Sequence, residues 1–297
     1  GDWGGIYLEQ NADLTLTYAH LSYTGYGINS AAYTNGVEIT HSRLEFSGGG
    51  IRFDYYGSNT SNMLRVITDN VISVASGDYA VHLQVCCESN VPSPEVSRNT
   101  ISNTQGSGVY VRGGYSGLTI DANTIKVNLS AVDVSATGGV ISITGNALES
   151  TATSSQYYNR GTGIVVNDPR ANGGSDNAIT SVTLQDNTLK GFGGGGALYF
   201  DGRDKTITSS ITGNTITDSY YRGMVITSLQ GTSITGNTVT GSTNAGVYLQ
   251  NAVPSAFKDN VITGNGTTTN EPGLYISHNN AELSESFLIK DNDLSGN

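Results

Sequence analysis

A short motif returns along almost the whole chain, and its spacing limits the fold more than any other feature. ITGNTI at residues 211–216 returns as ITGNTV at 234–239, and a looser copy, ITGNAL, stands at 143–148. With the Asn as anchor, the pattern apolar-x-x-Asn-x-apolar occurs at Asn70, Asn99, Asn123, Asn146, Asn187, Asn214, Asn237, Asn260 and Asn292. The steps between anchors are 29, 24, 23, 41, 27, 23, 23 and 32 residues, so the minimal unit has 23 residues and takes insertions. A period of roughly 20 to 50 residues is typical of solenoids and other repeat folds.

The repeat continues toward both ends of the sequence. The same frame fits ITHSRL, with Ser42 in the Asn position, and LTYAHL, with Ala19 there, again 23 residues apart. A small residue followed by apolar-x-apolar precedes each anchor, as in GIYL (5–8), GVYV (108–111) and GLYI (273–276). We therefore expect one domain over residues 1–297, with about eleven units and no linker. Because neither end shows a cap that would protect strand edges, we also expect the domain to be excised from a longer chain.

The residues inside each unit alternate apolar and polar with a period of two, which is typical of strands, and no helical stripe occurs. A βαβ fold is excluded because its crossover needs about 30 residues and a helix. A leucine-rich repeat shares the Asn fragment but needs a Leu-x-x-Leu-x-Leu run before it, and Thr232 stands in that run. A parallel β-helix remains, in which each unit is one coil and each strand pairs about 4.8 Å from its equivalents. We expect the anchor Asn itself to take the left-handed conformation at a corner, and its side chain to bond to the next Asn.

The repeated corner [DGRA]-N-[TVA]-[IVL], with its G-[IVL]-x-[IVLF] strand, resembles the right-handed parallel β-helix repeat of pectate-lyase-like proteins. The resemblance covers nearly all of the chain. It implies an all-β, single-stranded right-handed parallel β-helix (solenoid) of about eleven coils with three short strands per coil. It does not fix the function, because this fold carries lyases, hydrolases, epimerases, phage spikes and adhesins. In the enzymes of the family the substrate cleft usually lies along the first strand of each coil, here the Gly-apolar-x-apolar strand.

Composition argues against nucleic-acid binding and against a membrane-spanning segment. The net charge of -11 disfavours contact with a nucleic-acid backbone. No apolar run approaches the roughly 18 residues of a membrane span. The sequence does not open on a charged-then-apolar stretch, so we expect the signal of an exported form to have been removed before residue 1. The chain has 17 Tyr but only 6 Phe, which favours aromatic rings with one wet end.

The outward positions of the first strand carry the chemistry. Arg52, His82, Tyr110 and Asp133 fall on four successive coils, with Asp54, Gln84 and Arg112 in the neighbouring column. In one interpretation Arg holds the carboxylate of a uronate and His or Tyr moves the adjacent proton. In the other, oppositely charged neighbours only pair across the ladder. The family's Lys-x-x-x-Arg, Asp-Pro-His and clustered-Asp motifs are missing from this strand, and its Asp residues lie too far apart for ordinary glycoside hydrolysis.

A second group on the same face contains Tyr199, Tyr248 and Tyr275, with Asp201 and Gln250 beside them. Tyrosine rings spaced along a flat strip offer a platform on which sugar rings stack. The alternative is that these rings only shield the sheet, since Tyr is a favoured strand residue. The outward column of the second strand is mostly hydroxyls, such as Thr40, Thr212 and Thr235.

No cofactor is predicted. The four His show no metal-ligand spacing, and the acidic corners at Asp69, Asp186, Asp259 and Asp291 leave Ca²⁺ only as a minor alternative. Cys86 and Cys87 are adjacent, so a bridge between them would be strained, and two separate thiols are predicted.

These patterns predict an extracellular or cell-surface module for polysaccharide binding or adhesion. Its partner would be a polysaccharide or cell-surface glycan, and its oligomeric state stays open. The predicted glycan contacts are Asp54, Gln84, Asp133, Tyr199, Asp201, Tyr248, Gln250 and Tyr275. The first alternative is a lyase or epimerase-like enzyme acting on acidic (uronate) polysaccharide, with Tyr110, His82, Arg52 and Arg112 as catalytic residues. The second alternative is a structural stalk.

Overall fold

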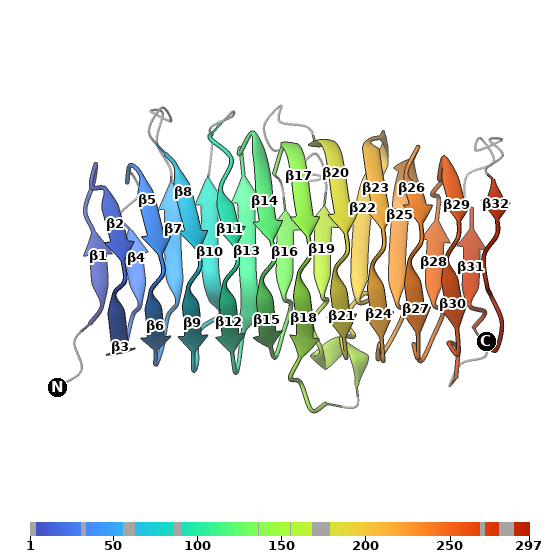
Figure 1. Cartoon of the computed structure of the whole chain (residues 1–297), viewed down its shortest axis with the longest axis horizontal. Coiled ribbons are helices and arrows are strands. Elements are labelled where there is room, and N and C mark those ends of the chain that lie inside the picture. The colour runs from blue at the N-terminus through green and yellow to red at the C-terminus, as the bar shows by residue number, and fades with distance from the viewer. Residues whose placement is uncertain are drawn as a thin grey trace.

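The structure, a computed structural model, describes residues 4–30, 34–55, 63–85, 91–135, 137–154, 156–167, 179–267, 271–278 and 288–297. Within these ranges the chain winds through three parallel sheets that run side by side from one end of the molecule to the other (Figure 1). The predicted fold class, an all-β right-handed parallel β-helix, is confirmed.

Each coil contributes one strand to each sheet, except that in the described residues the last coil has no strand in the third sheet. The sheets are called first, second and third by their order along the coil. The first sheet contains, in the described residues, β1 (Ile6–Leu8), β4 (Ile28–Ser30), β7 (Ile51–Tyr55), β10 (Tyr79–Val85), β13 (Ser107–Gly113), β16 (Val132–Ser135), β19 (Ile164–Asn167), β22 (Leu198–Thr206), β25 (Met224–Gln230), β28 (Val247–Gln250) and β31 (Leu274–Ser277). The second contains β2 (Leu14–Thr17), β5 (Val37–Thr40), β8 (Arg65–Thr68), β11 (Glu95–Ser97), β14 (Gly117–Asp121), β17 (Gly139–Thr144), β20 (Ile179–Gln185), β23 (Thr208–Thr212), β26 (Ser233–Thr235), β29 (Ala256–Lys258) and β32 (Ile289–Lys290). The third contains β3 (His20–Thr24), β6 (Arg43–Phe46), β9 (Val71–Val74), β12 (Thr100–Asn103), β15 (Thr124–Val127), β18 (Ala147–Ser150), β21 (Thr188–Lys190), β24 (Thr215–Thr217), β27 (Thr238–Thr240) and β30 (Val261–Thr263).

The core is a set of vertical columns inside the coil. In the second sheet one apolar residue per coil pairs in register with the next, and the members of this column between the two end coils are fully buried: Ile39, Ile67, Val96, Ile120, Ile143, Leu184, Ile211, Ile234 and Phe257. Full burial of one such side chain contributes roughly 1.5–3 kcal/mol. Since the alternation points every second residue inward, the core fixes which side chains face outward.

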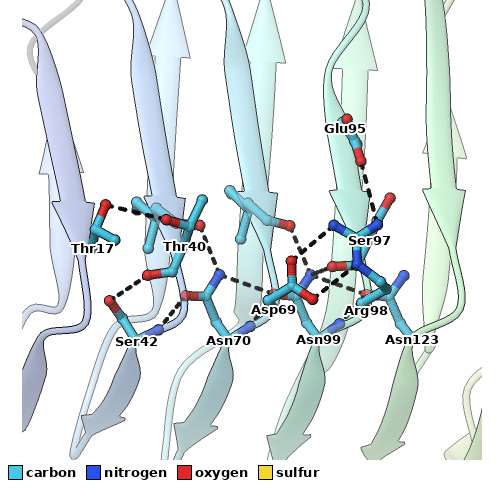
Figure 2. Close-up of polar contacts among 12 residues, drawn as sticks. Thr17, Thr40, Ser42, Asp69, Asn70, Glu95, Ser97, Arg98, Asn99 and Asn123 are labelled. Atoms are coloured by element: carbon cyan, nitrogen blue, oxygen red, sulfur yellow. Dashed lines mark hydrogen bonds and ion pairs between the residues drawn. The ribbon is translucent and has the colours of Figure 1, made fainter.

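The anchor asparagines form the predicted ladder at the corner between the second and third sheets. Asn70 donates from Nδ2 to Asn99 Oδ1 at 3.0 Å, and Asn99 donates in the same way to Asn123 (Figure 2). The backbone N–H of Asn70 also donates to Asn99 Oδ1, and Asn70 Nδ2 donates to the Ile39 carbonyl. The buried amides are thus satisfied by their neighbours, as buried polar groups must be.

The prediction that the Asn itself is left-handed was wrong. The left-handed residue is the one before it, as at Asp69 (φ 60), Arg98 (φ 56), Ala122 (φ 53) and Gly213 (φ 67). The turn at that residue directs the following Asn inward, where its side chain must be buried to reach the next coil. The corner therefore needs two residues with different roles.

One insertion is described between the third and first sheets. It follows β18, contains the 3-10 helix η1 (Tyr157–Asn159), and projects from the solenoid in Figure 1. Arg160 fastens it, with its guanidinium 3.3 Å from the Tyr220 ring centroid and Nη1 donating to the Gly191 carbonyl. Cys86 and Cys87 lie outside the described residues.

Candidate functional site

The outward columns of the first sheet lie in the predicted register. In the described strands the first column runs, pair by pair, through Tyr7, Asn29, Arg52, His82, Tyr110, Asp133, Val165, Tyr199, Val225, Tyr248 and Tyr275. The second runs through Asp54, Gln84, Arg112, Ser135, Asn167, Asp201, Thr227, Gln250 and Ser277. Residues up to 34 positions apart in sequence, such as Val165 and Tyr199, are therefore lateral neighbours on one face.

Arg52 and His82 both contact the carboxylate of Asp54. Arg52 donates from Nε to Asp54 Oδ2 at 2.7 Å, and its Nη2 lies 2.7 Å from the same oxygen. His82 Nε2 lies 3.3 Å from Asp54 Oδ1 without hydrogen-bond geometry, and 3.3 Å from Gln84 Oε1. The Arg52 guanidinium is thus already engaged by a carboxylate of its own strand, whereas the contact between His82 and Asp54 joins two neighbouring strands.

Two carboxylates on this face differ in their protonation behaviour. Burial raises the pKa of Asp54, but contacts with His82 and Arg52 outweigh burial, so the net pKa lies below its usual value. Burial raises the pKa of Asp133, and the hydrogen bond from Ser135 Oγ, at 2.9 Å, only partly opposes that rise. The pKa values of the two carboxyl groups are therefore shifted in opposite directions.

Three rings pack together beside Arg52. The centroids of Tyr110 and His82 lie 4.9 Å apart, and Tyr79 lies 4.8 Å from Tyr110 and 5.2 Å from His82. Tyr79 was missed in the sequence because Ala80 and Val81 are both buried, so the alternation that identifies outward residues is interrupted after it. Burial, with Tyr110 and Asp133 nearby, raises the pKa of Tyr79.

A pocket of about 370 Å³ opens where these strands begin. Its polar and aromatic lining comes from Tyr26, Asn29, Arg52, Asp78, Tyr79 and His82. Gly50 forms part of the wall, and a Cβ there would lie 2.4 Å from the Ala80 carbonyl oxygen, so only glycine lets the coils approach this closely. Tyr110, Asp133 and Arg112 lie farther along the sheet; Arg112 is exposed, and within the described residues no hydrogen bond or ion pair engages it.

The second predicted group is divided by the structure. Tyr248 and Tyr275 stack with centroids 5.1 Å apart and planes 17° apart. Tyr199 is separated from Tyr248 by Val225, which is buried in the same column. Asp201 is buried and pairs with Arg203 at 3.0 Å. The three tyrosines therefore do not form one continuous strip.

The Tyr248 ring has no free face. Tyr275 covers one face, and the Arg222 guanidinium covers the other, with Cζ 3.8 Å from the ring centroid. Tyr248 therefore already packs against two side chains of the chain itself, and its role as a stacking platform for sugar rings stays a prediction. Gln250 lies beside Tyr248 in the second column and is partly exposed.

Arg222 is a functional candidate that the sequence did not reveal. Its Nε lies 3.4 Å from Glu271 Oε2, and its Nη2 lies 3.5 Å from Oε1. Asn244 Nδ2 donates to Oε1 at 3.2 Å, and the Ala245 N–H donates to Oε2 at 3.1 Å. Burial raises the pKa of Glu271, but these donors outweigh burial and bring it below its usual value. All of these residues stand at corners before strands, outside the alternating positions.

Across the described ranges, no three His, Cys, Asp or Glu side chains come together in a group that fits a metal ion. The acidic corners that left Ca²⁺ open do not form such a group. In the same ranges no helix has the length and apolar character needed to cross a membrane.

Two family models together match the whole chain. Residues 1–148 match the right handed beta helix region, and residues 149–297 match the periplasmic copper-binding protein NosD. A solved structure, the A-module of the mannuronan C-5 epimerase AlgE4 from Azotobacter vinelandii, aligns at 14% identity and a TM-score of 0.46, with 99% of this chain and 87% of that chain covered. None of the curated proteins compared with the chain matches it.

The described side chains do not fit a copper site of the kind that the NosD name suggests. Copper prefers imidazole, thiolate and thioether ligands. Met63 and Met224 are buried in the core on different coils, while His20 and His82 each contact a carboxylate, Glu45 and Asp54. Within the described residues the site with the richest chemistry is therefore the outward face of the first sheet.

Proposed function

The chain belongs to the right-handed parallel β-helix proteins, and from that premise we propose that it is a polysaccharide-binding module that works outside the cytoplasm. Its contact surface would be the outward face of the first sheet. A periplasmic, extracellular or cell-surface location agrees with the NosD likeness of residues 149–297.

One observation carries the proposal: the faces of the solenoid differ in side-chain chemistry. In the described strands the first column of the first sheet holds five tyrosines, Tyr7, Tyr110, Tyr199, Tyr248 and Tyr275, together with Arg52 and His82. The matching column of the second sheet holds mainly Thr and Ser, and ends in Lys258 and Lys290. Tyrosine combines an apolar ring with a hydroxyl, and arginine presents a planar fork of donors, and both properties suit sugar rings with their hydroxyl and carboxylate groups.

The pocket beside Arg52 also supports the outward face of the first sheet as the contact surface. Its volume of about 370 Å³ lies within the range of roughly 300–1,000 Å³ that is common for small-ligand sites. It combines the rings of Tyr26 and Tyr79 with the Arg52 guanidinium and the Asn29 amide. These groups would hold one sugar unit while the rest of the polymer follows the sheet.

Two tyrosines give a matched test. Tyr26 lines the pocket and is 73% exposed, whereas Tyr18 stands at the corner between the second and third sheets and is 78% exposed. We expect Tyr26→Ala to reduce retention on immobilised polysaccharides at least fivefold, and Tyr18→Ala to leave it unchanged. Equal retention of both variants on every polymer that holds the native protein would contradict the proposed surface, and no retention on any polymer would leave a structural stalk.

A second candidate, an enzyme acting on acidic polysaccharide, is favoured by one observation. Asp133, whose pKa is raised by burial, pairs in register with Tyr110, and Tyr110 packs on His82. Perturbed acids cluster at catalytic sites more often than elsewhere. Incubation with uronate polymers tests it: ultraviolet absorbance from an unsaturated product, lost in Tyr110→Phe, would support a lyase, and retention without product would favour the binding module.

A further inference from the structure

The carboxylate of Glu271 sits in a complete receptor. Oε1 accepts from Arg222 Nη2 and Asn244 Nδ2, and Oε2 accepts from Arg222 Nε and the Ala245 N–H. Two donors on each oxygen, with an arginine fork on one side, is the arrangement by which proteins recognise a bound carboxylate. Here the carboxylate belongs to the chain itself.

The receptor is positioned without help from Glu271. Arg222 lies between the rings of Tyr248 and Tyr221, with Cζ 3.8 Å and 4.8 Å from their centroids. The Asn244 N–H donates to the Tyr221 carbonyl, and the Ala245 carbonyl accepts from Gly223, so both residues are fixed by the ladder. A receptor that keeps its shape when empty pays little ordering cost when a ligand binds.

Glu271 itself is held loosely. Its contacts with Arg222 are 3.4 and 3.5 Å, whereas a strong charge-assisted N–H···O bond is about 2.7–2.9 Å. Arg52 Nε lies 2.7 Å from Asp54 Oδ2, so the distances from Arg222 to Glu271 are long in comparison with another arginine–carboxylate pair of the same chain. A carboxylate with freedom to approach the arginine fork more closely would compete well with Glu271.

We propose that Arg222, Asn244 and Ala245 form a carboxylate-binding subsite at the edge of the first-sheet face, which Glu271 occupies until the carboxylate of an acidic sugar displaces it. This inference rests on the proposed polysaccharide-binding function and specifies the sugar class at one position. The neighbouring Tyr275 ring, 41% exposed, lies where the ring of that sugar would pack. Glu271 thereby acts as an internal competitor that weakens binding of acidic polymers.

The test is titration calorimetry with oligogalacturonate and with its methyl ester. Glu271→Gln keeps the shape of the side chain and removes its charge, so we expect about a tenfold gain in affinity for the acid form and none for the ester. Arg222→Gln should lower affinity for the acid form, and the double variant should show no gain from Glu271→Gln. Glu45→Gln is the matched control, because it also removes one negative charge and one arginine pair, that of Arg43 on the third sheet. It should leave affinity unchanged.

The possible results separate the inference from the function on which it rests. Acid-form binding that does not change in Glu271→Gln would overturn the subsite and leave the binding module intact. Equal gains in Glu271→Gln and Glu45→Gln would reduce the effect to net charge and overturn it as well. Failure of every variant to bind any polysaccharide, neutral polymers included, would remove the proposed function itself. Glu271→Ala gives a second route if Glu271→Gln melts far below the native protein, and tighter binding of a poly-glutamate peptide than of the sugar would reject the sugar assignment.

Discussion

Arg52 in the first half of the chain and Arg222 in the second each face a carboxylate of their own chain, but the two pairs are built differently. Arg52 and Asp54 are two residues apart on one strand and meet at 2.7 Å, with Arg52 57% exposed. Arg222 and Glu271 are 49 residues apart, meet at 3.4 Å, and the Arg222 side chain is only 19% exposed. The first pair forms wherever that strand forms, whereas the second exists only when three coils stack in register.

Breaking the stack should affect the second pair far more than the first. Asn237 lies in the coil between Arg222 and Asn244, and Asn237→Ala leaves the Asn214 N–H and Nδ2 without their buried acceptor. Each buried group left unpaired costs about 1–3 kcal/mol, so we expect a loss of about 3 kcal/mol in the free energy of unfolding. Hydrogen exchange followed by mass spectrometry should show the loss of protection centred on the coils around Asn237.

Thr240→Ala is the control for that variant, because it also removes polar atoms from the same coil but lies on the partly exposed third strand. It should change the free energy of unfolding by less than about 0.5 kcal/mol. A uniform loss of protection along the whole solenoid in Asn237→Ala would mean that the halves do not respond separately, and the contrast between the two pairs would fail.

The two pairs also differ in how far the sequence predicted them, because Arg52 lies within a strand whereas Arg222 and Glu271 lie at corners. The 23-residue period and the alternation of Leu14, Thr15, Leu16 and Thr17 fix both the coil and the outward direction, so the columns through Arg52 and Tyr248 followed from spacing alone. Corners obey no such rule. Arg222 and Glu271 stand before strands, and the direction of their side chains depends on the local turn.

Two further errors have the same cause. Tyr79 escaped notice because Ala80 and Val81 are both buried, so the period of two is broken next to it. The left-handed residue was assigned to the Asn because Asn adopts that conformation more readily than Arg98 or Ala122, and the sequence does not say which corner residue is buried. Register was therefore predictable from the repeat, while corner geometry required the packed structure.

Replacing Arg222 or Arg52 should lower the free energy of unfolding by unequal amounts, both smaller than the loss expected for Asn237→Ala. Arg222→Ala exposes one face of Tyr248 and leaves Glu271 without its main partner, and we expect a loss of about 1–2 kcal/mol. Arg52→Ala breaks an exposed pair and should cost less than about 1 kcal/mol. Guanidinium denaturation followed by circular dichroism measures both, with Arg43→Ala as a second exposed-pair control. If Arg52→Ala lost as much stability as Arg222→Ala or more, the contrast between an exposed pair within one strand and a partly buried pair between coils would be contradicted.

The smallest expected effects concern the pH dependence of stability, to which the carboxyl group of each pair contributes. The pKa values of Asp54 and Glu271 both lie below their usual range, although burial raises each, because hydrogen-bond donors and positive charge favour the ionised forms. A lowered folded-state pKa stabilises the protein above the unfolded-state pKa, about 4, and this stabilisation disappears as the pH falls through the folded-state value. Asp133, with its raised pKa, works in the opposite direction, so Asp133→Asn should raise the melting temperature at neutral pH and lose that advantage below about pH 4.

Carboxyl carbon NMR resolves the individual groups. Arg222→Ala should raise the titration midpoint of Glu271 and leave that of Asp54 in place, and Arg52→Ala should do the reverse. Because Asn244 and Ala245 still donate to Glu271 when Arg222 is gone, its midpoint should rise only partly toward the ordinary value. A Glu271 midpoint that does not move at all in Arg222→Ala would show that contacts of 3.4–3.5 Å contribute nothing to the carboxylate's charge state, and that the receptor's selectivity for anions comes from its two amide donors alone.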